Sequence, residues 1–442
     1  MDTKIRKIAI AALSVAVAGS LLTACGGGGN KSGDDNGKTK VTFWAAPNPT
    51  QVKYWDEMAK AYEKENPDVT VEVSQMKESP SSEATIQSAI ASKTAPTMSE
   101  NINRSFAAQL ADSKAIVPLN DVKGLDDVVK ERKMSETMDS WKFSDGNQYV
   151  LPVYSNPILF AWRLDTLKEL GYDTPPKTYS EALEVGKKLK AKYPDKVLWA
   201  KGDLSDPTAW MRWFDFFPLY DAASKGNAFV EDGKLVADDK AGTELLTFMS
   251  ELQKNKLLLA SKATDPFETG TSIMADNGPW TFPNWDEKFP ELKYNENYAI
   301  TAPLVPDSMA NEKNIATYAD SKGVVMYAQA TDKEKEAAMD FLKFVYNDDK
   351  NDLKFLETTN LIPARDDATE NEAFTAFFKE NPELEVYAAN VPYSIPAMDD
   401  AKYNDIQQVL GEEAWNPIVR GEKKPDKAWS DMKKAEDGVL QK

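Results

Sequence analysis

The sequence predicts an α/β protein, because strand-like and helix-like patterns alternate along most of its length. Residues 69–73 show the two-residue period of a half-buried strand, whereas residues 55–62 carry apolar side chains at the spacing of one helix face. Strand and helix follow each other through short links, which is typical of right-handed crossovers and a largely parallel sheet. About 400 residues follow residue 38, enough for two or more domains or for one fold with two lobes.

In the first third of the chain, apolar spacing and turn residues predict three strands and three helices. A turn at Asn48–Thr50 begins the first helix, and Pro67 follows its end. The expected strands are Lys40–Trp44, Val69–Val73 and a short one near Met98, and the expected helices run to about Glu65, around Ile86–Ile90 and over Ser105–Leu110.

The same reasoning extends to the rest of the chain, where helices come to dominate. Tyr149–Tyr154 and Val197–Ala200 have strand-like patterns. The expected helices are Leu164–Leu170, closed by Gly171, then Ser180–Lys192, Lys333–Tyr346 and Lys427–Gln441.

Composition excludes several kinds of chemistry. The chain has no histidine and one cysteine, so serine–histidine and cysteine–histidine nucleophiles and imidazole metal sites are impossible within it. Neither a phosphate-binding loop nor a dinucleotide fingerprint occurs. We therefore expect no cofactor and no metal. The net charge of −18 disfavours nucleic acid as a partner.

The N-terminus carries a processing pattern. Lys4, Arg6 and Lys7 precede the apolar stretch Ile8–Leu22, and the only cysteine, Cys25, follows directly after Ala24. The pattern resembles a bacterial lipoprotein signal, which implies cleavage after residue 24 and lipidation of Cys25. An ordinary secretory signal beside an unpaired cysteine is the alternative. Residues 25–38 contain no large apolar side chain, so we expect a flexible tether, with lipid as the only membrane anchor.

Polar and aromatic residues follow the predicted strands at the places where open α/β sheets bind ligands. Amide and guanidinium groups provide paired donors and acceptors for hydroxyls, and aromatic faces cover the C–H faces of sugar rings. These loops predict binding of a neutral, hydroxyl-rich ligand by Asn48, Asn103, Arg104, Tyr154, Asn156 and Trp280.

Several segments, taken in order, resemble the extracytoplasmic solute-binding proteins of ABC importers, in the oligosaccharide-binding group that includes maltose-binding protein. The segments are Lys40–Trp44, Thr174–Leu183, Asn277–Trp280, Ala337–Phe344 and Leu361–Arg365. The resemblance covers nearly all of residues 39–442. It implies two α/β lobes, each a mixed, mostly parallel sheet flanked by helices, with a cleft between them.

The resemblance also implies where the chain passes between the lobes, at Leu151–Val153, Thr317–Tyr318 and Leu361–Pro363. Lobe 1 would hold residues 39–152 and 318–362, and lobe 2 would hold residues 153–317 and 363–442. Such a hinge of three crossings would let the lobes close on a ligand.

Family analogy adds further candidates. The aromatic stripe of residues 210–217 has helical spacing, which is typical of a helix face that packs in the core, and Phe214 and Phe217 are expected there. By analogy with the family, the start of this stripe would lie near the cleft, so Trp210 and Trp213 are candidates for ligand binding. The remaining candidates follow the second crossing or the Ile395–Pro396 turn, and they are Asp320, Lys322, Asp399 and Tyr403.

These observations predict a lipid-anchored, monomeric binding protein on the extracytoplasmic face of a bacterial membrane, which presents a di- to tetrasaccharide to ABC permease subunits. It would not be an enzyme. Two alternatives remain. A cell-surface glycoside hydrolase needs only two carboxylates, and a polyamine receptor would suit the acidic composition. The cleft loops hold Arg104 and Lys322 among few acids, which favours a sugar.

Overall fold

The computed structural model describes residues 37–206 and 209–441, and Lys38–Lys442 form one compact unit. The expected signal peptide (1–24), Cys25 and the tether up to residue 36 lie outside the described residues. Within the part of the chain that is described, no helix is both long and apolar enough to cross a membrane.

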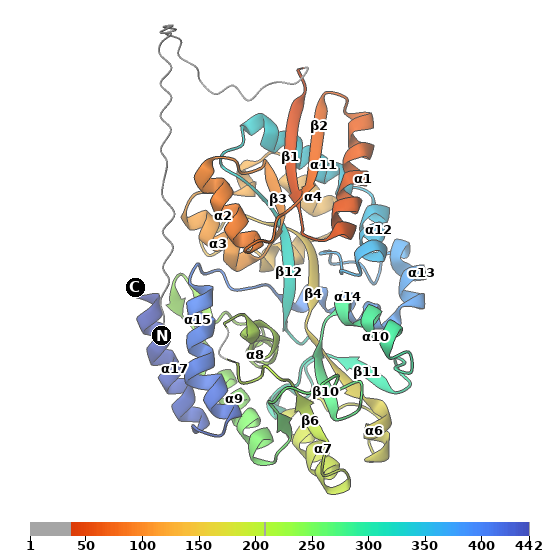
Figure 1. Cartoon of the computed structure of the whole chain (residues 1–442), viewed down its shortest axis with the longest axis vertical. Coiled ribbons are helices and arrows are strands. Elements are labelled where there is room, and N and C mark those ends of the chain that lie inside the picture. Colours follow the sequence, from red (N-terminus) through yellow and green to blue (C-terminus); the bar gives the residue numbers. More distant parts are fainter. Residues whose placement is uncertain (1–36, 207–208, 442) are drawn as a thin grey trace, which may run out of the picture. The chain divides into compact units, whose positions relative to one another are not determined.

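The first of two main sheets is built largely from the N-terminal part of the unit (Figure 1). Its strand order is β13-β12-β3-β1-β2, with β4 paired to β12. β1 is parallel to β2 and β3, whereas β12 is antiparallel to β3 and β4. The strands are β1 (Thr39–Ala45), β2 (Val69–Gln75), β3 (Met98–Ile102), β4 (Leu151–Pro157), β12 (Thr317–Met326) and β13 (Ser394–Ile395).

The second sheet has the order β11-β5-β10-β6-β9 and also mixes directions, because β5 is antiparallel to β10 and β11 whereas β6 is parallel to β10 and β9. Its strands are β5 (Leu159–Arg163), β6 (Val197–Ala200), β9 (Leu258–Leu259), β10 (Ser272–Asn277) and β11 (Tyr298–Thr301). A small separate ribbon pairs β7 (Val230–Glu231) with β8 (Lys234–Leu235).

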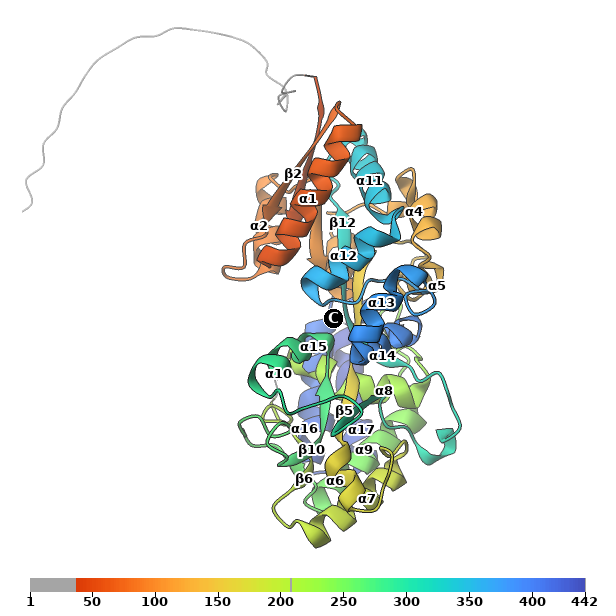
Figure 2. The ribbon, with the colours of Figure 1, turned by 90° about the vertical axis from the view of Figure 1, so that its right-hand side faces the viewer.

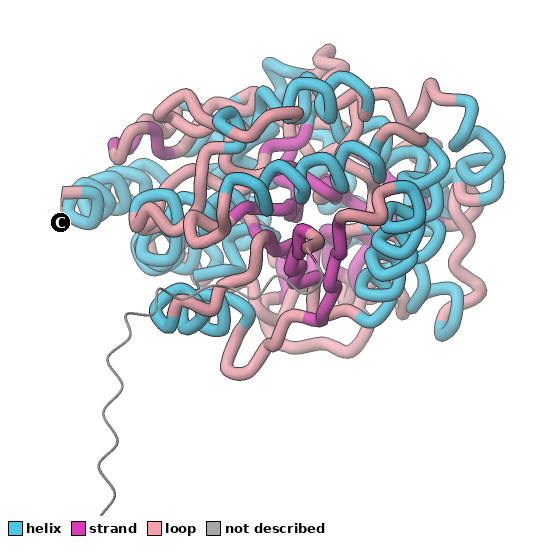
Figure 3. Tube along the Cα trace, turned by 90° about the horizontal axis from the view of Figure 1, so that it is seen from above, coloured by secondary structure: helices cyan, strands magenta, loops and turns pink. Residues whose placement is uncertain are grey.

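Helices surround both sheets, as the side view in Figure 2 and the view from above in Figure 3 show. Those near the first sheet are α1 (Pro49–Glu65), α2 (Ser82–Ser92), α3 (Arg104–Asp112), α4 (Leu125–Glu131), α5 (Ser135–Ser140), α11 (Asp332–Tyr346) and α12 (Asp349–Thr359). Those near the second are α6 (Leu164–Glu169), α7 (Tyr179–Lys192), α8 (Phe216–Ser224), α9 (Asp239–Lys254), α10 (Phe282–Lys288), α13 (Glu372–Glu380), α14 (Pro382–Asn390), α15 (Tyr403–Leu410), α16 (Asn416–Val419) and α17 (Pro425–Leu440).

The predicted α/β class with mixed sheets is confirmed, and most predicted helices agree to within a few residues. Local chemistry explains the agreement, since Asn48 caps α1 by accepting from the Thr50 N–H at 2.9 Å, and Thr178 forms a capping box in α7. The predicted single helix over residues 210–217 is wrong. A 3₁₀ helix ends at Phe214, and Asp215 starts α8 anew by accepting from the Phe216 N–H at 2.6 Å.

Three segments far apart in the sequence run side by side between the two sheets. β4 pairs with β12 from Leu151 opposite Val324 to Pro157 opposite Ala319. The Ser155 N–H donates to the Ile362 carbonyl at 2.9 Å, and the Ala364 N–H donates to the Val153 carbonyl at 3.1 Å. These segments include the residues at which the family resemblance implies the three crossings. The crossings themselves and the lobe boundaries remain a proposal.

A buried ionic network fixes two of these segments. The Arg132 guanidinium makes two bonds to Asp352, at 3.0 and 2.8 Å, and also donates to the carbonyls of Pro152 and Val153 on β4. Arg365, just beyond the third crossing, donates to the same Asp352 at 3.2 Å. All three charged side chains are at most 2% exposed. One carboxylate is therefore shared by two buried guanidinium groups, of which Arg365 also pairs with Asp349 and Asp367.

We predict that Asp352→Ala destabilises the protein by about 3–5 kcal/mol, because it leaves two buried guanidinium groups without their shared partner. Denaturant unfolding of fragment 38–442 measures the change. Asp349→Ala is the matched control, since Asp349 also binds Arg365 but is 41% exposed, and it should cost about 1 kcal/mol or less. Equal effects of the two variants would contradict the role assigned to Asp352.

Candidate ligand-binding site

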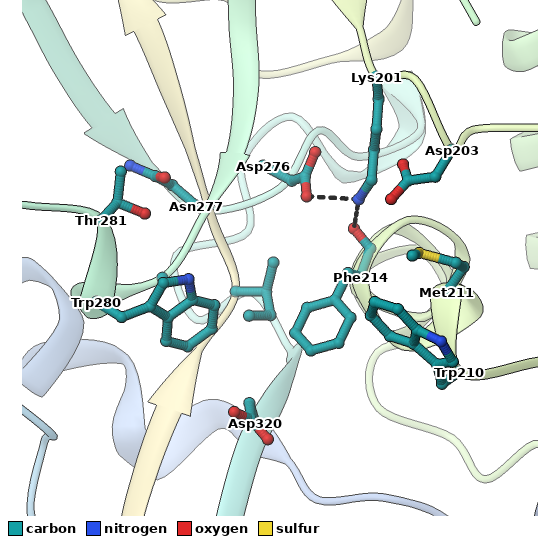
Figure 4. A pocket seen from close by; sticks show the side chains of 12 residues that line it. Lys201, Asp203, Trp210, Met211, Phe214, Asp276, Asn277, Trp280, Thr281 and Asp320 are labelled. Carbon is teal, nitrogen blue, oxygen red and sulfur yellow. Dashed lines mark hydrogen bonds and ion pairs between the residues drawn. The ribbon is translucent and has the colours of Figure 1, made fainter. Parts of the chain in front are cut away.

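A cavity of about 360 Å³ lies at the strand ends of the second sheet (Figure 4). Its walls come from the end of β10, the segment after β6, the 3₁₀ helix at 209–214, and β12. The lining residues are Ile158, Lys201, Asp203, Trp210, Met211, Phe214, Asp276, Asn277, Gly278, Trp280, Thr281 and Asp320.

Two tryptophans form the aromatic part of this cavity. Trp210 and Trp280 are 52% and 43% exposed, which is unusual for side chains of this size. Phe214 lies between them, with its ring centroid 6.0 Å from Trp210 and 6.3 Å from Trp280, edge to face in both cases (Figure 4). A Cβ at Gly278 would come within 2.2 Å of the Trp280 ring, so glycine is required for the indole to fold back over this backbone.

An ion pair forms the polar part. The Lys201 ammonium donates to Asp276 at 2.7 Å and to the Phe214 carbonyl at 3.0 Å (Figure 4). Asp276 also accepts from the Trp199 indole N–H at 3.1 Å. Burial alone would lower the pKa of Lys201, but the carboxylates of Asp276 and Asp215 raise it above its usual value. The ammonium therefore stays charged and holds the 3₁₀ helix against the end of β10.

Hydrogen-bonding groups remain available beside this pair. Asn277 Nδ2 and Asp203 Oδ1 are buried, and neither has a hydrogen-bond partner among the described residues. Buried polar atoms normally find partners, so these two are suited to bonding hydroxyl groups of a ligand or water. Asp320 contributes a third carboxylate from β12. The cavity thus combines aromatic faces with several donors and acceptors.

Three of the predicted site residues, Trp210, Trp280 and Asp320, meet in this cavity. Asn48 and Asn103 instead cap helices, since the Asn103 side chain accepts from the Phe106 N–H at 2.7 Å in the same way as Asn48 in α1. Tyr154 is buried with its ring stacked on Phe355.

The other predicted residues also lie outside this cavity. Asn156 is buried and accepts from the Ile362 N–H at 3.1 Å, so its side-chain oxygen ties two crossing segments together. Lys322 pairs with Tyr154 along β12 and β4. The Tyr403 hydroxyl donates to Glu83 at 3.1 Å. Trp213, Arg104 and Asp399 line a second, smaller cavity. Ligand contact by any of these residues remains a prediction.

Two expectations about the site are corrected. Phe214 is not purely a core residue, because it lines the cavity between the tryptophans. The cleft was expected to hold few acids, yet three acids, Asp203, Asp276 and Asp320, line this cavity together with one lysine, Lys201. Two sequence signals could have indicated the site residues that were missed. Lys201 and Asp203 follow the predicted strand that ends at Ala200, and Asp276 directly precedes the Asn277–Trp280 motif.

Comparison with known proteins identifies the family. The model of the bacterial extracellular solute-binding proteins matches residues 57–386. The chain therefore belongs to this family, a class of binding proteins located outside the cytoplasm.

Solved structures agree with this assignment. A crystal structure of an uncharacterized protein from Listeria monocytogenes EGD-e is 98% identical, covers 91% of this chain and all of that one, and gives a TM-score of 0.91. The cyclic α-maltosyl-1,6-maltose binding protein of Arthrobacter globiformis is 20% identical over 92% of this chain and all of its own, with a TM-score of 0.77. The sugar-binding protein MalE of Xanthomonas citri is 18% identical over 91% and 98%, with a TM-score of 0.72. The two-lobed fold is thereby confirmed.

Proposed function

We propose that this protein captures an oligosaccharide in the cavity beside Trp210 and Trp280 and delivers it to an ABC importer. The observation that carries the proposal is the pair of exposed tryptophans on either side of Phe214, next to a charged and amide-rich wall. Aromatic faces would cover the C–H faces of sugar rings, while the carboxylates, Lys201 and Asn277 would bond the hydroxyls. The Arthrobacter structure is of a protein that binds a cyclic oligosaccharide.

The space available suits more than one sugar ring. An adjoining cavity of about 530 Å³ shares Lys201, Asp203, Asp276 and Asn277 with the first and extends to Trp285. Both volumes are within the range of about 300–1,000 Å³ that is typical of ligand sites. A di- to tetrasaccharide would occupy the first cavity and enter the second.

Closure of the lobes would complete the site. Among the residues that line the first cavity, only Asp320 comes from the proposed lobe 1. Contacts from one side cannot favour a closed state, so a ligand must gain further contacts when lobe 1 approaches. In this proposal the described conformation is an open form, and the permease subunits recognise the closed, loaded form.

Lipid anchoring would hold this monomeric receptor at the extracytoplasmic face of the membrane. The proposal rests on Cys25 and on the signal-like residues before it. We predict that the mature wild-type chain carries lipid on Cys25 and that Cys25→Ala releases the chain or leaves it unprocessed. The Cys25→Ala chain should bind ligand with the same affinity as fragment 38–442, which lacks Cys25. Intact mass measurement and membrane fractionation provide the test. Mature wild-type chain with an unmodified Cys25 in the medium would contradict it.

Ligand screening tests the proposed function directly. The acidic cavity wall also suits a polyamine, so thermal unfolding of fragment 38–442 should be measured with oligosaccharides and with spermidine and putrescine. We predict that an oligosaccharide raises stability, by about 2.7 kcal/mol at 100 times its dissociation constant, and is recovered intact. Stabilisation by polyamines alone would support the cation receptor instead, and steady hydrolysis of the sugar would support the glycoside hydrolase.

The two tryptophans should contribute unequally. We predict that Trp280→Ala weakens binding of that oligosaccharide by about 2–4 kcal/mol, because it removes a stacking face from a desolvated site. Trp210 is more exposed, and Trp210→Ala should cost about 1–2 kcal/mol on the same grounds. Calorimetric titration measures both. Wild-type affinity in a folded Trp280→Ala protein would show that the site is misplaced.

A further inference from the structure

A second cavity, of about 230 Å³, shares no lining residue with the first. It lies between α8, the segment 226–230, β12 and the segment after β13, and Arg104 closes part of its wall. Trp213 and Phe214 are neighbours on the 3₁₀ helix, yet Trp213 lines the second cavity and Phe214 the first. The proposed sugar cavity therefore does not account for this second one, although Arg104, Trp213 and Asp399 were sugar-site candidates from the sequence.

The unusual group in this cavity is the carboxylate of Asp221, on α8. The residue is 5% exposed, and no hydrogen bond or ion pair to its carboxylate occurs among the described residues. Burial raises its pKa well above the usual value. A buried carboxylate without a partner is costly, and a counter-ion that enters the cavity would remove that cost.

Aromatic side chains form the walls next to Asp221. Trp213 stacks on Tyr318 with ring centroids 4.9 Å apart and contacts Phe217 at 4.8 Å, and Phe229 packs on Phe217 at 5.5 Å. Burial raises the pKa of Tyr318, and the negative charges of Asp320 and Asp221 raise it further. Asp221 and Tyr318 both line this cavity.

The other charged groups of this cavity compensate each other. Arg104 lies 3.8 Å from Asp399 and stacks over the Phe143 ring at 5.2 Å. Asp399 also accepts from the Ser144 N–H at 2.6 Å and from its hydroxyl at 3.0 Å. Asp221 is thus the acidic residue of this lining whose carboxyl group has no partner among the described residues.

We propose that this second cavity binds a small organic ammonium ion, with Asp221 as its counter-ion and the aromatic walls against its alkyl groups. Aromatic faces attract cations, and the attraction is strongest where the site is desolvated. A metal ion does not fit as well, because the described residues contain no group of three acidic, histidine or cysteine side chains that could hold one. The proposal is independent of the sugar site.

Choline is a suitable probe, and 3,3-dimethyl-1-butanol is its neutral isostere. We expect calorimetric titration of fragment 38–442 to detect choline binding and to show affinity at least about tenfold weaker for the isostere. Asp221→Asn should abolish the preference for choline. Asp112→Asn is the matched control, because it removes the same charge from an exposed residue outside this cavity and should bind choline like wild type.

The sugar site provides the remaining controls. Trp280→Ala should bind choline normally, and Asp221→Asn should bind the oligosaccharide normally, which also verifies its fold. Equal affinity of the wild-type protein for choline and the isostere would overturn the proposal without any variant. Choline binding that survives Asp221→Asn, or that is displaced by the oligosaccharide, would overturn it as well. Failure of the oligosaccharide to bind would contradict the proposed function and would not bear on the choline site.

Discussion

The shared carboxylate of Asp352 is the constraint on which the position of the ligand cavity depends. It holds Arg132, which in turn bonds the carbonyls of Pro152 and Val153, and it holds Arg365 beyond the third crossing. Two crossing segments are thereby fixed at one point. Farther along, the Ser155 hydroxyl lies 2.9 Å from the hydroxyls of both Ser321 and Ser394, so polar contacts continue through the crossing. Buried polar networks of this kind are stable only when their members are satisfied.

A short stretch of backbone connects the ligand cavity to this ionic network. β4 leads within two residues into β5, where Leu159 pairs with Asn277 at the end of β10. Asp276 then reaches Lys201 after β6, and Lys201 holds the 3₁₀ helix that bears Trp210 and Phe214. A displacement of β4 would therefore be transmitted to the segments that carry both tryptophans. Hinge and site are coupled by these pairings, which is the arrangement that ligand-driven closure requires.

Much of the fold could be predicted from the sequence, because apolar period and capping residues report on local structure. The α1 and α7 caps and the strand at Val197–Ala200 are examples. Trp280 could be predicted because Gly278 and Pro279 end a strand abruptly. The Lys201–Asp276 ion pair could not be predicted, because the apolar period of a strand does not indicate which distant strand supplies the partner of a charged residue. The stripe at residues 210–217 was misleading because one side-chain cap, at Asp215, outweighed its helical spacing.

The central claim is that a sugar first binds on one lobe and then closes the other over it. Small-angle X-ray scattering of fragment 38–442, with and without the stabilising oligosaccharide, tests this most directly. The account predicts a smaller radius of gyration at saturation, and the same compaction should fail to occur with choline. An unchanged radius of gyration at saturating oligosaccharide would contradict it.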